Sequence, residues 1–203
     1  MPIDPASLTM PERFQHLLTV ISGNRFLQMT GIGKEVPFYI CPYKPEDALD
    51  IERIQKQLSN QLEQSGVRVL SINLYDLSMN ILKRDGDFEW LIANEQRLPK
   101  QRILEEIQGI LDVQTVLVQE IGKQLNSNEY DVLFLSGVGE VYPYIRSHNV
   151  LNNLQSVAKQ RPTLMFFPGA YTQSLETGAS LDLFGRLNDD KYYRAFNIFH
   201  CEP

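Results

Sequence analysis

Residues 131–155 read DVLFLSGVGEVYPYIRSHNVLNNLQ, and the expected architecture can be built outward from them. Val132–Leu135 is apolar at every position, which is typical of a strand covered by helices on both faces. A Ser-Gly-Val-Gly turn follows at residues 136–139, and Tyr144–Lys159 then has apolar residues at helical spacing. A buried strand, a glycine turn and a helix in this order indicate a parallel α/β unit.

Similar units recur along the chain. Segments rich in β-branched and aromatic residues predict further strands at Val36–Tyr43, Val67–Leu74, Thr163–Phe167 and Ala195–Phe199. Helical patterns lie between them, and we expect one long helix after Pro99 with apolar positions from Ile103 to Leu125. Strands separated by helices favour parallel pairing with right-handed crossovers. The expected fold is an α/β three-layer sandwich whose mainly parallel sheet has about five strands, Rossmann-like or degenerate P-loop-like.

Turns are predicted where helix and strand patterns stop. Pro168-Gly169 is expected to end the Thr163–Phe167 strand, and the carboxylates Asp182, Asp189 and Asp190 are expected in a solvated loop.

The 203 residues and 23.4 kDa predict a single α/β domain spanning 1–203, with an N-terminal helical extension at 1–30. The net charge of −6 and the pI near 5.1 argue against a general nucleic-acid binder. No apolar run approaches the roughly 18 residues of a membrane span, and the N-terminus lacks a secretory signal pattern. We therefore expect a cytoplasmic protein without membrane contact, in which Cys41 and Cys201 are reduced thiols.

The glycine pair Gly137-Val-Gly139 lies where α/β proteins bind ligands, beyond the carboxyl end of a strand. A phosphate loop would also need Gly-Lys-Ser/Thr, and a dinucleotide fingerprint would need glycine at the position of Tyr142. A second pair, Gly31-Ile-Gly33, precedes a strand and lacks the same groups. We interpret both as structural turns and expect no cofactor. A nucleotide-dependent enzyme or switch using residues 136–140 is the alternative.

The helix predicted after the glycine turn has two distinct faces. At about 100° per residue, the apolar positions Val150, Leu151, Leu154, Val157 and Ala158 face the sheet. The opposite face has two interpretations, a plain solvated surface and a partner-binding surface, and its tyrosines and arginine are residue types that anchor interfaces. The candidate partner-binding residues are Tyr142, Tyr144, Ile145, Arg146, His148, Asn149 and Asn152.

No arrangement of titratable residues predicts catalysis. His16 is expected to pack within an amphipathic helix, and His148 has no recognisable nucleophile beside it. Asp76 is the best-placed single carboxylate, but one carboxylate does not make an active site. The histidines lack metal-ligand spacing. We therefore assign no catalytic, cofactor-binding or metal-binding residue.

The C-terminal stretch 193–199 reads YRAFNIF and is predicted to close the core as a strand, with Tyr193, Ala195, Asn197 and Phe199 on one face. Its aromatic residues beside Arg186 and Arg194 leave open a DNA-binding subunit that stacks bases. The acidic balance of the chain counts against that alternative.

Four blocks, "FLSGVGEVYPYIRSHNVLNNL", "PTLMFFPGAY", "LDLFG" and "YYRAFNIF", occur in order at suitable spacing. In these blocks the sequence resembles the BrxB family of bacteriophage-exclusion (BREX) defence systems. The resemblance implies a part in a multi-protein antiphage complex that restricts incoming DNA while methylation marks host DNA. It implies a non-catalytic accessory or adaptor subunit, partnered by other BREX subunits and foremost by the phosphatase-like PglZ. Nucleic acid would then be contacted only indirectly, through the complex.

Overall fold

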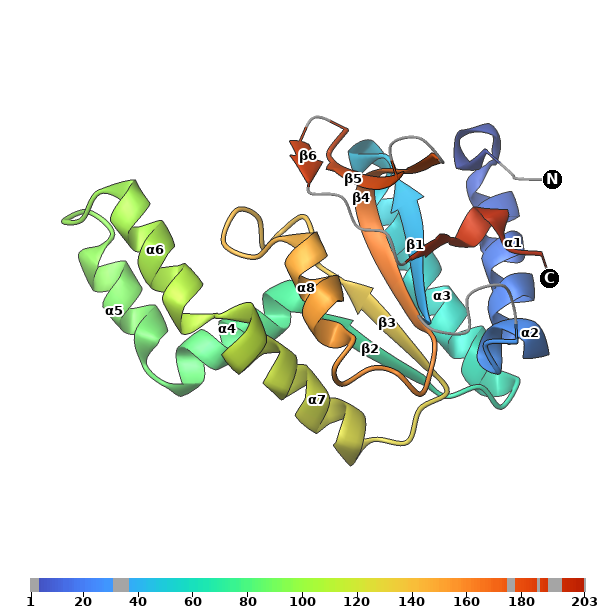
Figure 1. The fold of residues 1–203 in the computed structure, drawn as a ribbon, viewed down its shortest axis with the longest axis horizontal. Helices are drawn as coiled ribbons and strands as arrows, with labels where there is room; N and C mark the ends of the chain where they lie inside the picture. Colours follow the sequence, from blue (N-terminus) through green and yellow to red (C-terminus); the bar gives the residue numbers. More distant parts are fainter. Residues whose placement is uncertain (1–3, 31–36, 175–177, 186, 190–194, 203) are drawn as a thin grey trace.

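The computed structural model describes residues 4–30, 37–174, 178–185, 187–189 and 195–202. Its centre is a parallel sheet with the strand order β2-β3-β4-β1-β7 (Figure 1). Each neighbouring pair along this path is parallel, and Thr163 of β4 lies beside both Phe38 and Leu133. The predicted mainly parallel α/β sheet is therefore confirmed. The strands of this path are β1 (Phe38–Tyr43), β2 (Val69–Asn73), β3 (Val132–Ser136), β4 (Thr163–Ser174) and β7 (Phe196–Asn197).

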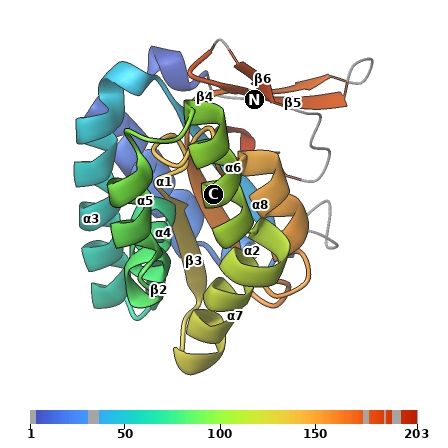
Figure 2. The same cartoon turned by 90° about the vertical axis from the view of Figure 1, so that its left-hand side faces the viewer.

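Helices cover both faces of the sheet, as the continuously apolar strands require. In β3, Phe134 faces one apolar cluster and Leu135 faces the other. Figure 2 shows the two layers, with α1 and α3 to one side of β3 and α8 to the other. The first layer holds α1 (Met10–Ser22), α2 (Asn24–Leu27) and α3 (Ala48–Gln64). The second is built on α4 (Leu74–Arg84), α7 (Val118–Ser127) and α8 (Ser147–Leu154).

Helix α1 belongs to the first layer, although it was expected within an N-terminal extension. Its side chains Leu17 and Ile21 are fully buried in the same cluster as Phe134. A capping box starts the helix, because Thr9 accepts from the amide of Glu12 while the Glu12 carboxylate accepts from the amide of Thr9. Short 3-10 turns are present at Pro5–Ser7 and Pro45–Asp47.

The turn predicted at Pro168-Gly169 is wrong. Strand β4 continues to Ser174 and pairs antiparallel with β5 (Gly178–Leu183), which pairs with β6 (Leu187–Asp189). Gly169 permits this pairing, because a Cβ there would lie 2.1 Å from the carbonyl oxygen of Asp182. Asp182 and Asp189, predicted in a loop, therefore lie in strands, and Asp190 lies outside the described residues.

The long helix predicted from Ile103 to Leu125 is also wrong. It is divided into α6 (Lys100–Ile110), a π-helical turn at Val113–Leu117, and α7. The division occurs at Asp112, whose Oδ1 accepts from the amide of Thr115 at 2.7 Å and thereby starts a new turn.

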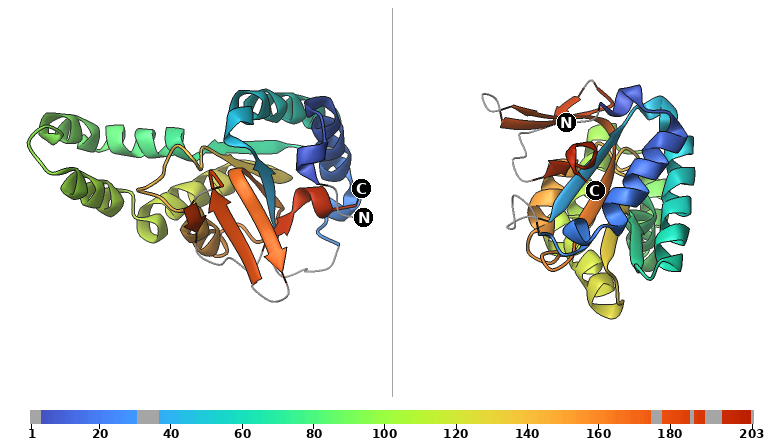
Figure 3. Two further views of the ribbon diagram at one scale, coloured as in Figure 1. Left: turned by 90° about the horizontal axis from the view of Figure 1, so that it is seen from above. Right: turned by 90° about the vertical axis from the view of Figure 1, so that its right-hand side faces the viewer.

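Helices α5 (Asp87–Asn94) and α6 project away from the sheet. We call residues 87–110 the arm. Figures 1 and 3 show the arm extending beyond α4 and α7. Gly86, with a φ of 82°, turns the chain into α5, and Leu111 turns it back toward α7. The arm is therefore joined to the body of the protein at two breaks in helical structure.

The predicted C-terminal strand Ala195–Phe199 is shorter than expected. Only Phe196–Asn197 pairs with β1, and a 3-10 turn at Ile198–His200 follows because Asn197 Oδ1 accepts from the amide of Phe199. Tyr171 anchors the segment, since its hydroxyl donates to the carbonyl of Ala195 at 2.6 Å. Arg186 and Arg194, which the DNA-binding alternative placed beside base-stacking aromatic residues, lie outside the described residues, as does Tyr193 of the predicted strand.

None of the helices in the described part of the chain is both long and apolar enough to cross a membrane.

Candidate partner-binding surface at the carboxyl edge of the sheet

The loop after β3 lies at the carboxyl edge of the sheet, and its first glycine is explained by packing. Gly137 has a φ of 74°, and a Cβ there would lie 2.3 Å from Oδ1 of Asn73. That oxygen is already engaged, because it accepts from the amides of Tyr75 and Asp76 at the start of α4. Gly137 is thus needed for the close approach of the loop to a helix cap.

The second glycine of the loop packs against the β4–β5 hairpin. A Cβ on Gly139 would lie 2.9 Å from Cγ of Pro168 and 3.0 Å from Cε1 of Phe184. The loop also uses amides internally, since Glu140 donates to the carbonyl of Gly137 at 3.1 Å. Close packing therefore accounts for both glycines.

Apolar side chains hold this loop against the body of the protein. Val138, Val141 and Ile145 are all buried in the cluster that also contains Leu135 of β3. The amide of Ile145 donates to the carbonyl of Val141 at 2.9 Å, which closes the last turn of the loop before α8. The loop thus presents a surface of fixed shape.

Tyrosines from different segments gather around Glu140. The hydroxyl of Tyr144 lies 3.4 Å from the carbonyl oxygen of Glu140. Burial is the main cause that raises the pKa of Tyr144, and electrostatic interactions with Tyr75 and Glu140 raise it further. Burial, with smaller electrostatic contributions from Cys41 and Glu140, raises the pKa of Tyr43 to about 12. The hydroxyls of Tyr43 and Tyr144 therefore stay protonated at neutral pH. Tyrosine offers an apolar ring and a hydrogen-bonding hydroxyl together, a combination that is enriched at protein interfaces.

The structure corrects part of the predicted outward face. Ile145 is 1% exposed and His148 is 8% exposed, so neither side chain forms surface. The projection was wrong because α8 begins at Ser147 rather than at Tyr144, which leaves Ile145 in the preceding turn. The helix also ends early, at Leu154, and Val157, predicted to face the sheet, is 39% exposed.

The remaining candidate residues do lie together near the carboxyl edge. Arg146, Asn149 and Asn152 are exposed, and Tyr142 and Tyr144 are half-buried against the core. The loop also reaches the arm, since Nε2 of Gln108 in α6 lies 3.5 Å from the carbonyl oxygen of Pro143. The role of these five candidate residues in partner binding stays a prediction.

The groups considered for catalysis have ordinary structural environments. His16 stacks on Phe199 with ring centroids 5.6 Å apart, which confirms its predicted packing role. Asp76 is exposed in the first turn of α4. Cys41 and Cys201 are both free thiols. Within the ranges that the structure describes, no three His, Cys, Asp or Glu side chains gather as metal ligands.

Sequence reasoning missed the exposed apolar residues of the arm. Trp90 is 44% exposed and Ile92 is 58% exposed, both on α5. The available signal was the single tryptophan of the chain within a short segment rich in charge, DFEWLIAN.

Comparison with known proteins agrees with the resemblance of the sequence blocks. The family model described as BREX protein BrxB matches residues 70–198. A "BREX protein BrxB" of Bacillus cereus (strain H3081.97) is 34% identical over 194 residues, which cover 92% of this chain and 96% of the relative. A "BREX protein BrxB" of Escherichia coli O9:H4 (strain HS) is 28% identical over 97% of this chain and 93% of its own length.

No solved structure gives a significant match to this one. The family match spans more than half of the chain, and the matched residues include β3, the glycine loop and α8. The chain therefore belongs to the BrxB family of BREX antiphage defence systems.

Proposed function

We propose that the protein is a non-catalytic accessory subunit of the BREX system that acts through contacts with another subunit, foremost PglZ. The observation that carries the proposal is the filled carboxyl edge of the sheet. In other α/β proteins this edge is open and binds ligands. Here Gly137 and Gly139 approach Asn73, Pro168 and Phe184 so closely that neither could carry a Cβ.

The chemistry left at this edge suits a protein partner. Tyr144 and Tyr75 offer rings and hydroxyls, and Arg146, Asn149 and Asn152 offer exposed polar side chains close by. Because the loop beneath them is held by buried Val138, Val141 and Ile145, little ordering is required when a partner binds.

Co-purification with PglZ tests the proposal. We expect the two full-length proteins to leave a sizing column together at micromolar concentration. Independent elution of both proteins would remove the main support for a PglZ-binding accessory subunit. Calorimetry with ATP, GTP and NAD in the presence of magnesium tests the nucleotide alternative, and micromolar binding abolished by Gly139→Val would favour it.

Two substitutions separate surface from core effects. Arg146→Glu changes an exposed residue and is expected to weaken co-purification without lowering the melting temperature. His148→Ala removes a side chain that is 8% exposed, so it is expected to lower the melting temperature as well. A fall in melting temperature for Arg146→Glu that matches its loss of binding would indicate a fold defect.

A further inference from the structure

The arm, residues 87–110, carries more apolar surface than its own packing needs. Among its described side chains only Leu91 is buried, and α6 contains no buried residue. Ile103, Ile107 and Ile110 of α6 are partly buried against the core cluster. Trp90 and Ile92, on the outer helix α5, are exposed by 44% and 58%. Exposed tryptophan is uncommon on a surface that binds nothing and is enriched at the centres of protein interfaces.

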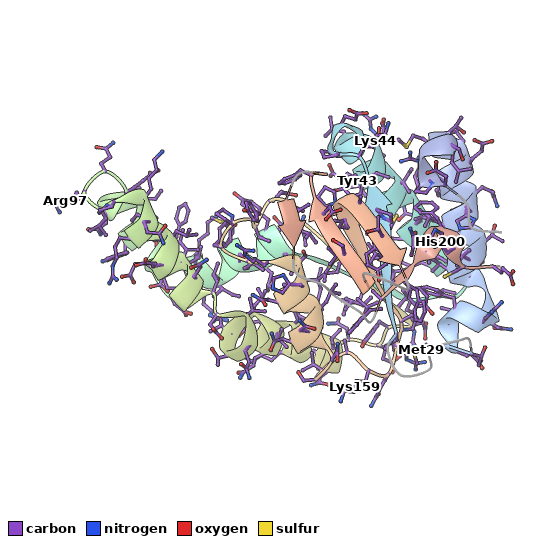
Figure 4. The ribbon with its side chains drawn as sticks, turned by 45° about the horizontal axis from the view of Figure 1, so that its top comes forward. Met29, Tyr43, Lys44, Arg97, Lys159 and His200 are labelled. Atoms are coloured by element: carbon purple, nitrogen blue, oxygen red, sulfur yellow. The ribbon has the colours of Figure 1, made fainter. Side chains whose placement is uncertain are left out.

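The tip of the arm adds positive charge beside this apolar surface. Arg97 and Lys100 flank Leu98 and Pro99, and both are exposed. In the part of the chain that the structure describes, neither cation forms an ion pair or a hydrogen bond, whereas Arg102 pairs with Glu106 within its own helix. Figure 4 shows Arg97 at the end of the arm, pointing away from the protein.

Unpaired cations at an exposed tip can bind either protein carboxylates or nucleic-acid phosphates. The neighbouring acids distinguish the two, because Asp87, Glu89 and Glu95 lie on the same helix as Trp90 or directly after it. Together with a net charge of −6 they would repel a polyanion. A protein surface can instead place carboxylates opposite the tip alone and apolar side chains opposite Trp90.

We propose that the arm is a docking element for a partner protein whose contact surface combines an apolar strip with carboxylate side chains. The carboxylates meet Arg97 and Lys100, and the apolar strip covers Trp90, because Ile92 lies about 200° from Trp90 around the same helix. This inference rests on the proposed function, and it extends the binding surface beyond the carboxyl edge of the sheet. The two surfaces adjoin, since Gln108 of α6 contacts the loop at Pro143.

The test uses the full-length chain and the purified subunits of the same BREX system, beginning with PglZ. The charge variant is Arg97→Glu with Lys100→Glu, and the apolar variant is Trp90→Ala. The matched charge control is Lys159→Glu with Arg161→Glu, which reverses two exposed cations on the body of the protein. The matched apolar control is Leu49→Ala, at a side chain on α3 that is 70% exposed.

We expect each arm variant to weaken binding to a subunit by about tenfold or more, as loss of a central interface residue does. Both controls should bind within about twofold of the wild type, the usual effect of changes outside an interface. The wild-type affinity should fall as salt is raised, and the charge variant should show a shallower dependence. If Trp90→Ala lowers the melting temperature, its loss of binding no longer separates docking from folding. The charge variant then tests the inference, because its changes lie only at exposed positions.

Three results would overturn the inference. If a subunit binds wild type and arm variants equally, the arm is not the docking element, although the proposed function stands. If no subunit binds the wild type, the proposed function fails and this inference fails with it. If the charge variant instead abolishes self-association or salt-sensitive binding of duplex DNA, the arm meets a second copy or a nucleic acid.

Discussion

Single residues explain why the chain turns where it does at the carboxyl edge of the sheet. Asn73 ends β2 and caps α4. The chain leaves β3 at Gly137, which lies directly against that cap. At the opposite edge, Asp131 holds the start of β3 to the residue before β2. Its carboxylate accepts from both the amide and the guanidinium of Arg68 at 2.9–3.0 Å. Each edge of the sheet thus depends on a few polar contacts between residues far apart in sequence.

Replacing Gly137 by alanine should destabilise the protein by about 3 kcal/mol. About 1–2 kcal/mol comes from the left-handed backbone, and the rest comes from overlap with Asn73. Gly66→Ala is the control, because Gly66 has a φ of 84° with no atom within 4 Å of a Cβ. Urea unfolding should therefore show a clearly larger loss for Gly137→Ala. Equal losses would mean that the approach to the helix cap is unimportant.

Asp131→Asn should flatten the dependence of stability on acidic pH. Hydrogen bonds from Arg68 lower the pKa of Asp131 from 3.8 to about 2. A folded-state pKa below the unfolded value gives stability that is present above about pH 4 and lost as the pH falls toward about 2. The melting temperature of the wild type should therefore fall more steeply across that window than that of the variant. Parallel curves would contradict this role.

At the scale of elements, the breaks between helices determine where the arm leaves the body of the protein and where it returns. Asp112 divides an otherwise helical stretch by binding the amide and the hydroxyl of Thr115, each at 2.7 Å. This break turns the chain back from the arm toward α7, and Gly86 serves the opposite connection. The projecting arm is therefore a consequence of local capping chemistry.

Asp112→Ala should destabilise the protein by about 1 kcal/mol, the usual effect of losing a helix cap. Thr115→Val removes only the hydroxyl contact and keeps the amide, so it should destabilise less. Denaturant unfolding of both single variants and the double variant measures their coupling. Fully additive losses would show that the two side chains do not act as one cap.

At the scale of the molecule, burial is unevenly distributed. Strands β3 and β4 lie between two helical layers, and Leu133, Leu135 and Phe167 are fully buried. The arm has only Leu91 buried and is attached at two breaks. The free energy of local opening should therefore be lower in the arm than in the sheet.

Native-state hydrogen exchange should show this difference. Amides of α5 and α6 are expected to exchange through local opening, at lower free energy than amides of β3 and β4. A stoichiometric partner that binds the arm should slow exchange there and leave the sheet unchanged. Equal protection of arm and sheet in the isolated protein would contradict the expected difference.

The amino-acid sequence alone determined the layered α/β architecture and the family. A strand that is apolar at every position, such as Val132–Leu135, buries both of its faces only between two helical layers, and this requirement can be read from a few consecutive residues. Ordered sequence blocks likewise identify the family without coordinates. The missing phosphate-binding residues around Gly137 were equally visible in the chain.

Only the tertiary structure decided which candidate residues form surface. Ile145 and His148 are buried because the loop folds onto the core before α8 begins, a contact that helical periodicity does not encode. Strand β4 passes through Pro168 because β5 pairs with it, and Gly137 and Gly139 are required by Asn73, Pro168 and Phe184. Each of these outcomes depends on contacts between residues distant in sequence. Local propensity is weak beside such contacts, and tertiary packing therefore overrides it.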